Sequence, residues 1–380
     1  MHRIESVASR HPRFVAGVAG LLVMASFAGG CGESPADDRT VAFDRTAVQR
    51  EMDTMVKEGV PGVVTLVREG DQTATLTAGS ADLETSAPVE SDDRFRIGSL
   101  TKPYVGAIIM QLVEEGKLSL DDTVEELLPG RIPNGDRITL KQVMRHESGI
   151  AEYFGPKVLK PYLAGDLGHV WTPDQLIDIA VAEGPLFPPG TDVSYSNTNY
   201  AVAGKIIEKA TGKTLEEEME SRIFEPLSLD DTSFVTDAGI EKPFANGYLV
   251  GNGKPQDVTA LTPFYWGAGN IVSTAGDVSA FYSALFDGEL VSEDSLAEMK
   301  DTVAENAEVG QGIGLVDGDF SCGHGYGHDG SVPGYYSGAF ELDSGRQLVF
   351  LANSITLDDT IASPKAQKSL GKMVEAAICS

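Results

Sequence analysis

The residues with the clearest potential for chemistry are Ser99 and Lys102, in the stretch Ser99-Leu100-Thr101-Lys102. On a helix this spacing puts the hydroxyl and the amine on one face, one turn apart. A serine hydroxyl becomes a good nucleophile when a neighbouring base takes its proton. A lysine can be that base only when neutral, so its surroundings must lower its pKa from about 10.4. The pair predicts acyl transfer through a covalent ester on Ser99.

Two later motifs give this pair its context, because Ser369-Leu370-Gly371-Lys372 has the same spacing on an expected ordinary helix. Tyr195-Ser196-Asn197 supplies a phenol and an amide, and His328-Asp329-Gly330-Ser331 supplies a base before a glycine. The ordered set of Ser-x-x-Lys, Tyr-x-Asn and basic residue-x-Gly resembles the serine β-lactamase and penicillin-binding protein superfamily. Tyr-x-Asn is typical of its class C-like branch.

Longer segments carry the same resemblance, namely residues 143–150 around His146-Glu147-Ser148-Gly149, residues 267–274 and residues 325–336. The resemblance spans about residues 45–380 and is strongest to the branch's secreted D-alanyl-D-alanine carboxypeptidases. It implies an α+β fold of the β-lactamase/transpeptidase type. An antiparallel sheet flanked by helices would face a mostly helical second lobe at about residues 120–245, with the active site between them.

The resemblance also implies roles for individual residues. Ser99 would be the nucleophile, and Lys102 would hold or take its proton. Tyr195 would carry the proton to the leaving group and later activate water. Asn197 would hold the acyl amide of the substrate, and His328 would support Tyr195 electrostatically. Whether Lys102 or Tyr195 is the primary base stays open at this point.

Residues of the third motif would complete the cleft. The backbone N–H groups of Ser99 and Ser331 would form the oxyanion hole. Asp329 and Gly330 would contact substrate, and Asp329 stands where many related peptidases carry a threonine that binds the substrate carboxylate. At an effective dielectric near 20, two carboxylates about 4 Å apart repel by roughly 4 kcal/mol. The substitution therefore favours neutral esters or peptides with a free amine.

Other candidates are weaker. Phe264 and Trp266 are expected either to form an aromatic wall of the cleft or to pack in the core. His146 and His324 are expected to be structural. We expect no cofactor and no metal, because nothing has metal-ligand spacing and no glycine loop fits phosphates.

The expected function is a serine hydrolase of the D-alanyl-D-alanine carboxypeptidase type. The alternatives are an esterase or D-amino acid amidase or aminopeptidase, a class C-like β-lactamase, and a penicillin-binding sensor that acylates without turnover. The expected partner is a small acyl or peptide substrate, such as a cell-wall peptide, an ester or a β-lactam. We expect a monomer.

The N-terminus has the pattern of an export signal. Arginines precede an apolar run at residues 14–27, which ends in small residues before Cys31. This pattern predicts a signal peptide at residues 1–30 and lipidation of Cys31, with free secretion as the alternative. Residues 31–44 read as a polar tether, and residues 45–380 as a single catalytic domain.

Composition sets further bounds on partners and compartment. The formal net charge of −28 excludes nucleic acid and argues against charge-driven attachment to anionic lipid. Membrane contact would then occur only through an N-terminal lipid. Apart from Cys31, the chain has only Cys322 and Cys379. In an exported protein these two are expected to form a disulfide rather than two free thiols.

Hydrophobic periodicity predicts the elements that position these residues. Helices are expected at about residues 46–57, from about 100 to Gly116, and at 140–145, 173–183, 200–210 and 363–377. Strands are expected at 63–68, 73–78, 334–341 and 347–353, and a short strand or a loop at 94–97.

Overall fold

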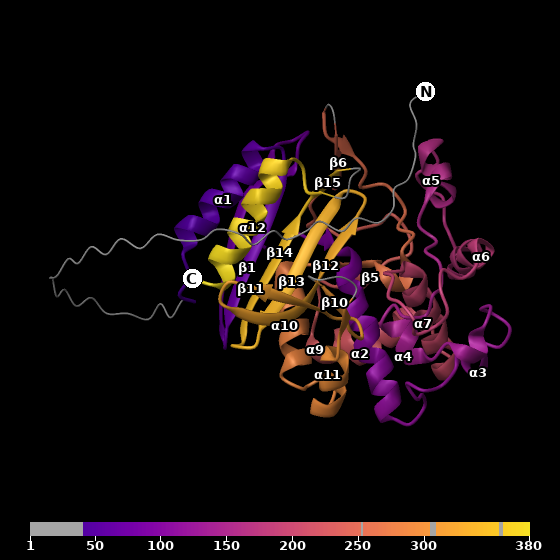
Figure 1. Ribbon diagram of the computed structural model, residues 1–380. Coiled ribbons are helices and arrows are strands. Elements are labelled where there is room, and N and C mark those ends of the chain that lie inside the picture. Colours follow the sequence, from indigo (N-terminus) through magenta and orange to yellow (C-terminus); the bar gives the residue numbers. More distant parts are fainter. Residues whose placement is uncertain (1–40, 252–253, 305–308, 357–359) are drawn as a thin grey trace, which may run out of the picture.

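The computed structural model describes residues 41–251, 254–304, 309–356 and 360–380 (Figure 1). The predicted signal peptide, Cys31 and residues 31–40 of the predicted tether lie outside the described residues, so lipidation stays a prediction. Within the described ranges, no helix is both long enough and apolar enough to cross a membrane.

A nine-stranded sheet forms the centre of the molecule, and each strand pair in it is antiparallel. The first long strand lies beside the last, with Val64 opposite Leu351. Across the sheet the order is β3 (Ala87–Pro88), β2 (Gln72–Asp82), β1 (Gly62–Glu69), β14 (Arg346–Ala352), β13 (Tyr335–Leu342), β12 (Gly323–Val332), β11 (Val316–Phe320), β10 (Gly310–Gln311) and β9 (Val303–Ala304).

The two terminal helices, α1 (Arg45–Lys57) and α12 (Pro364–Ile378), pack side by side on one face of the sheet (Figure 1). Their apolar faces bury Met52 and Leu370 against sheet residues such as Phe350. Helix α1 begins where the Asp44 carboxylate accepts the N–H of Ala47 at 2.9 Å, and such caps satisfy a backbone donor that the helix leaves unpaired. Helix α10 (Ala275–Phe286) contacts β1, β13 and β14.

The helical lobe, residues 120–245, lies at one side of the sheet layer (Figure 1). Thr139, Thr172 and Thr214 each begin a helix with a capping box. Its helices are α3 (Val124–Leu127), η2 (Gly135–Arg137), α4 (Leu140–Met144), α5 (Pro156–Leu163), α6 (Pro173–Glu183), α7 (Asn197–Thr211), α8 (Leu215–Met219), η3 (Glu220–Phe224) and α9 (Glu225–Leu227).

Two three-stranded sheets and several further elements complete the fold of the described residues. One sheet has the order β4 (Phe95–Arg96), β8 (Ile271–Ser273) and β5 (Ser233–Phe234). The other has the order β15 (Ser354–Thr356), β6 (Tyr248–Val250) and β7 (Gln256–Asp257). The remaining elements are the 3₁₀ turns η1 (Gly98–Leu100) and η4 (Trp266–Ala268) and the helices α2 (Thr101–Glu114) and α11 (Glu293–Lys300).

The α+β architecture expected from the sequence is confirmed: a large antiparallel sheet is flanked by helices. One local expectation needs refinement, because Ser99 lies in the η1 turn and α2 begins only at Thr101. A disulfide joins Cys322, at the turn before β12, to Cys379, just after α12.

Candidate active site

Ser99 and Lys102 meet at the junction of η1 and α2. The amine nitrogen Nζ of Lys102 lies 2.9 Å from Ser99 Oγ. Lys102 is fully buried, whereas Ser99 is partly exposed. The spacing of three residues therefore gives the contact that the sequence predicted, with the amine inside the protein and the hydroxyl open to a substrate.

Two further oxygens surround the amine of Lys102. Asn197 Oδ1 lies 2.9 Å from Nζ and the backbone carbonyl of Ala268 lies 3.0 Å from it. Neither oxygen can donate a hydrogen bond, so both must accept one from the amine. A neutral amine has two N–H groups, which these two acceptors use. Its lone pair then faces Ser99 Oγ, which is the geometry for taking the serine proton.

The electrostatics favour the neutral amine. Burial lowers the pKa of Lys102 to about 7, while the negative charges of Glu152 and Asp329 act in the opposite direction. Moving an ammonium out of water costs more free energy than its attraction to these two carboxylates gives. Desolvation therefore sets the direction of the pKa shift. Near neutral pH a large fraction of Lys102 is therefore ready to act as a base.

Tyr195 contacts the same Ser99 hydroxyl as Lys102 does. Its phenol donates a hydrogen bond to Ser99 Oγ at 2.9 Å, and the Lys102 amine lies 4.8 Å from the centre of its ring. Burial raises the pKa of Tyr195 well above its usual value, and the charges of Asp329 and Glu152 add to the rise. The phenol is thus protonated at physiological pH and suits the role of proton donor.

Strand β12 reaches the nucleophile through a close backbone contact at two glycines. A Cβ on Gly330 would lie 2.2 Å from the Ile97 carbonyl oxygen and 3.0 Å from Ser99 N. A Cβ on Gly98, whose φ is +55°, would lie 2.9 Å from Ser331 N. Only glycine allows this approach. The approach brings together the two backbone segments that carry the expected oxyanion donors, Ser99 and Ser331.

The third motif also supplies His328 and Asp329. His328 is buried, its Nδ1–H donates to the carbonyl oxygen of Asp329, and its ring centre lies 6.2 Å from that of Tyr195. The Asp329 side chain is 37% exposed, and its field reaches both Lys102 and Tyr195. It is therefore a solvent-accessible carboxylate at the site.

Phe264 and Trp266 are both buried, which agrees with the second of their two expected roles, packing in the core. Trp266 packs so tightly on α7 that a Cβ on Gly204 would lie 2.4 Å from its ring. Phe264 is 1% exposed and stacks against Tyr265. Both rings serve packing because the loop folds inward: Asn270 Oδ1 accepts the N–H groups of Tyr265 and Trp266. The exposed aromatic is Phe154, 36% accessible, which stacks on Phe264.

A partly buried carboxylate, Glu152, was missed by the sequence analysis. Its two oxygens accept the backbone N–H groups of Asn197 at 2.5 Å and Phe154 at 2.7 Å. Burial raises its pKa to about 6, although these hydrogen bonds and the nearby Lys102 favour its charged form. It stands between the Tyr-x-Asn motif and the exposed aromatic. No spacing pattern in the sequence singles it out.

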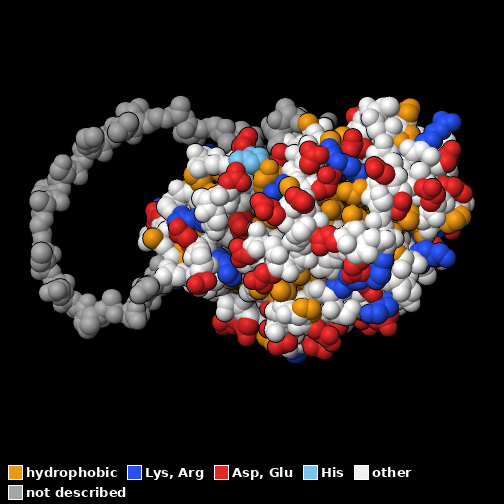
Figure 2. Space-filling model, turned by 90° about the horizontal axis from the view of Figure 1, so that it is seen from below, with side chains coloured by type: hydrophobic (Ala, Val, Ile, Leu, Met, Phe, Trp, Pro, Cys, Tyr) orange, Lys and Arg blue, Asp and Glu red, His pale blue; other side chains and the backbone are white. Residues whose placement is uncertain are grey.

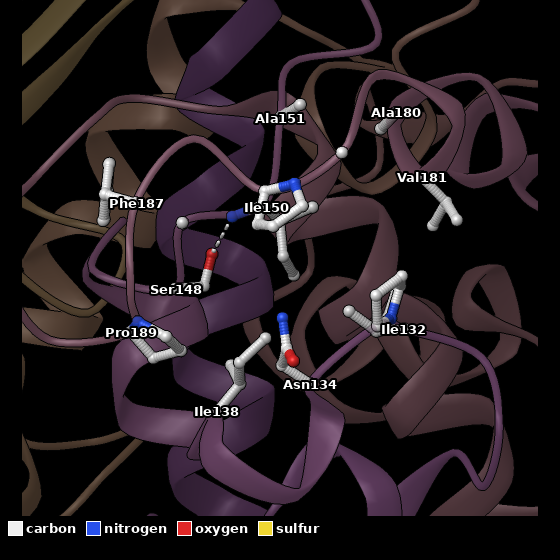
Figure 3. Close-up of a pocket in the computed structure, with 14 residues that line it drawn as sticks. Ile132, Asn134, Ile138, Ser148, Ile150, Ala151, Ala180, Val181, Phe187 and Pro189 are labelled. Atoms are coloured by element: carbon white, nitrogen blue, oxygen red, sulfur yellow. Dashed lines mark hydrogen bonds between the residues drawn. The ribbon is translucent and has the colours of Figure 1, made fainter.

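A separate cavity lies in the helical lobe (Figure 3). It is mostly apolar, with residues such as Ile132, Ile138 and Val181 in its wall, and Ser148 Oγ accepts the N–H of Ile150 there at 3.1 Å. The residues that line it do not include Ser99 or Lys102. Among the described residues, no group of three or more His, Cys, Asp or Glu side chains could hold a metal ion.

Fold and site together define a class: a serine hydrolase with a lysine and a tyrosine on the nucleophile, built on the β-lactamase and penicillin-binding protein fold. The comparisons agree. The chain belongs to the Beta-lactamase family, whose profile matches residues 45–367. Penicillin-binding protein 4 of Amycolatopsis lactamdurans is 30% identical over 317 residues, covering 78% of this chain and 81% of that protein.

Solved structures extend the likeness. The D-stereospecific amidohydrolase of Streptomyces sp. is 34% identical with a TM-score of 0.79, and covers 88% of this chain and 99% of its own. The D-amino acid amidase of Ochrobactrum anthropi SV3, in complex with L-phenylalanine amide, is 28% identical with a TM-score of 0.76. This match covers 87% of this chain and 97% of that one.

Proposed function

We propose that this protein hydrolyses amides or esters of amino acids that carry a free amine, with the acyl group held on Ser99. The observation that carries the serine chemistry is the contact of one partly exposed hydroxyl with a buried amine and a protonated phenol. The D-configuration of the substrate is proposed from the likeness to the D-stereospecific amidohydrolase of Streptomyces sp. and the D-amino acid amidase of Ochrobactrum anthropi SV3.

Acylation begins at Ser99. Neutral Lys102 takes the Oγ proton while Oγ bonds to the carbonyl carbon, and the oxyanion accepts hydrogen bonds from the N–H groups of Ser99 and Ser331. The C–N or C–O bond then breaks. Tyr195 protonates the leaving group and takes back the proton that Lys102 received. Lys102 is the base in this scheme, because its pKa is lowered and that of Tyr195 is raised.

Deacylation runs through the same groups in reverse. Water gives a proton to this network as its oxygen attacks the ester carbonyl, and Ser99 Oγ leaves as the hydroxyl. The net reaction consumes one amide or ester and one water, and releases an acid and an amine or alcohol.

The charges at the site support an amine-bearing substrate. Glu152 and Asp329 both lie close enough to influence the pKa of Lys102, the base that contacts Ser99. A substrate ammonium would be attracted by both carboxylates, whereas a C-terminal carboxylate would be repelled by roughly 4 kcal/mol at about 4 Å and an effective dielectric near 20. An amidase or aminopeptidase therefore fits these charges better than the carboxypeptidase that the sequence favoured.

A substrate panel tests the proposal. D-alanine p-nitroanilide should turn over at least about tenfold faster than its N-acetyl derivative, because acetylation removes the charge that the carboxylates bind. The panel also holds L-alanine p-nitroanilide, a D-alanyl-D-alanine peptide blocked at its amine, and nitrocefin. Faster turnover of the blocked peptide would contradict the amine requirement but leave the serine chemistry intact.

The nucleophile is tested separately. Ser99→Ala should abolish both turnover and covalent labelling by a fluorophosphonate probe. The matched control is Ser369→Ala, in the second Ser-x-x-Lys stretch on α12, which should label like the parent protein. Labelling that persists in Ser99→Ala would contradict the assignment.

A further inference from the structure

The loop of residues 146–152, here the His146 loop, begins with an unusual backbone conformation. His146 has a φ of +60°, which side chains with a Cβ seldom adopt. Such strained positions persist where the surrounding structure holds them, and they gather at functional sites. The residues it contacts show what the conformation achieves.

His146 holds the chain on both sides of Tyr195. Its carbonyl oxygen accepts the N–H of Ser194 at 3.0 Å, and its ring nitrogen Nδ1 accepts the N–H of Ser196 at 3.0 Å. A backbone N–H can only donate, so Nδ1 carries no proton. The Asn199 side-chain amide also lies 3.2 Å from Nδ1. One residue therefore fixes the backbone immediately before and after the phenol.

The imidazole also covers the phenol itself. The rings of His146 and Tyr195 stack with centres 4.5 Å apart and planes at 25°. Stacking and the two backbone bonds together restrict both translation and rotation of the Tyr195 ring. The phenol oxygen is the atom that must stay 2.9 Å from Ser99 Oγ.

Hydrogen bonds tie the rest of the loop to α7. Ser148 Oγ donates to Asn199 Oδ1 at 2.6 Å, and the Ala151 carbonyl accepts from Thr198 Oγ1 at 2.7 Å. Ser148, Ile150 and Ala151 also border the cavity of Figure 3. These hydrogen bonds hold the His146 loop against α7.

We infer that His146 is a positioning residue for proton transfer: it holds the Tyr195 phenol in line with Ser99 Oγ and the leaving group. His146 acts through Tyr195 and does not itself transfer the proton. This inference rests on the proposed serine chemistry and on the donor role of Tyr195, and it revises the sequence-based expectation of a merely structural histidine.

The leaving group gives a readout specific to positioning. A p-nitroaniline must be protonated as it leaves, whereas p-nitrophenolate leaves as an anion. A displaced Tyr195 therefore slows cleavage of the p-nitroanilide of a D-amino acid more than that of its p-nitrophenyl ester. Loss of general structure would slow both alike.

The test compares three variants by kcat and KM on this matched pair. His146→Phe keeps a ring but removes the acceptor, and its kcat on the anilide should fall at least about tenfold more than on the ester, with little change in KM. His146→Asn keeps an acceptor and tolerates the left-handed backbone, so it should show a selective loss of about threefold. His324→Phe, on the opposite end of β12 from Ser331, is the control and should match the parent protein.

Each possible outcome either supports or overturns the positioning role of His146. A larger loss on the anilide than on the ester, partly rescued in His146→Asn, supports the inference. An unchanged anilide-to-ester ratio overturns it. If His146→Phe does not fold, the ratio in His146→Asn decides alone. A parent protein that cleaves neither substrate, or a Ser99→Ala variant that cleaves both, would instead refute the proposed function.

Discussion

At the scale of single residues, the site depends on the protonation of Lys102. Its neutral form is needed for attack, and burial sets its pKa at about 7. The rate constant for acylation by p-nitrophenyl acetate should therefore rise with pH through a midpoint near 7 and then level off. This substrate has no amine that titrates in the same range, so a stopped-flow pH profile reports the enzyme. A flat profile between pH 5 and pH 9 would contradict the role of Lys102.

The carboxylate of Glu152 affects the pH midpoint of the acylation profile, because it acts on the pKa of Lys102. Its negative charge stabilises the ammonium form of Lys102 and so raises the lysine pKa. Glu152→Gln should therefore move the midpoint of the acylation profile to lower pH. Glu84→Gln, at an exposed position after β2, is the matched control and should leave the midpoint in place. A shift to higher pH in Glu152→Gln would show that the two side chains do not interact as described.

Sequence motifs predicted the residues whose side-chain type the reaction requires. They missed residues whose role depends on contacts made only in the folded structure. Ser99, Lys102 and Tyr195 belong to motifs whose order points to one site, and the structure brings them together. Glu152 is a single carboxylate between small and aromatic residues, so no spacing rule singles it out. The stack of His146 on Tyr195 depends on a left-handed turn that no local pattern indicates.

At the scale of elements, the site is assembled where β12 touches η1. Gly330→Ala would put a Cβ 2.2 Å from the Ile97 carbonyl and force the strand away from Ser99. Losing one oxyanion donor costs about 100-fold to 1,000-fold in rate, so fluorophosphonate labelling of Ser99 should slow by at least about 100-fold. Gly371→Ala, on α12 with open space around the position, should label normally. Equal labelling rates in the two variants would contradict the close approach.

Strong periodicity explains which elements could be predicted. The amphipathic α1 and the β-rich strands β1 and β2 match the expected ranges within a few residues at most ends. Helix α7 begins at Asn197, three residues earlier than expected, since tertiary contacts of the Tyr-x-Asn motif set its start. Short strands such as β9 and β10 have two residues each, too few for any period to show.

At the scale of the whole molecule, the disulfide between Cys322 and Cys379 joins the N-terminal end of β12 to the C-terminus. Its sequence separation of 57 residues corresponds to about 4 kcal/mol of loop-closure entropy in the unfolded chain. Cys322→Ser with Cys379→Ser should therefore lower Tm by several degrees in calorimetry. Ester hydrolysis at 25 °C should stay near the parental rate, because Ser331 lies at the other end of the strand. An unchanged Tm would contradict this stabilisation.

The formal net charge of −28 is also a property of the whole molecule. Figure 2 shows acidic side chains spread across the whole face in view, with fewer basic ones among them. Such a field attracts cationic substrates and is screened by salt. For D-alanine p-nitroanilide, kcat/KM should fall between about 20 mM and 500 mM sodium chloride, whereas for neutral p-nitrophenyl acetate it should change little. A rise with salt for the cationic substrate would contradict this attraction.

The pairing of β1 with β14 governs when the enzyme can first act. Val64 pairs with Leu351, and Ser99 contacts β12. Each partner lies more than two hundred residues downstream in the sequence. Contacts this distant in sequence form late and slowly. A nascent chain that has already emerged with its nucleophile still lacks the strand that would hold an oxyanion. Catalytic competence therefore requires the chain through β12, and a truncation before β12 should yield an inert polypeptide.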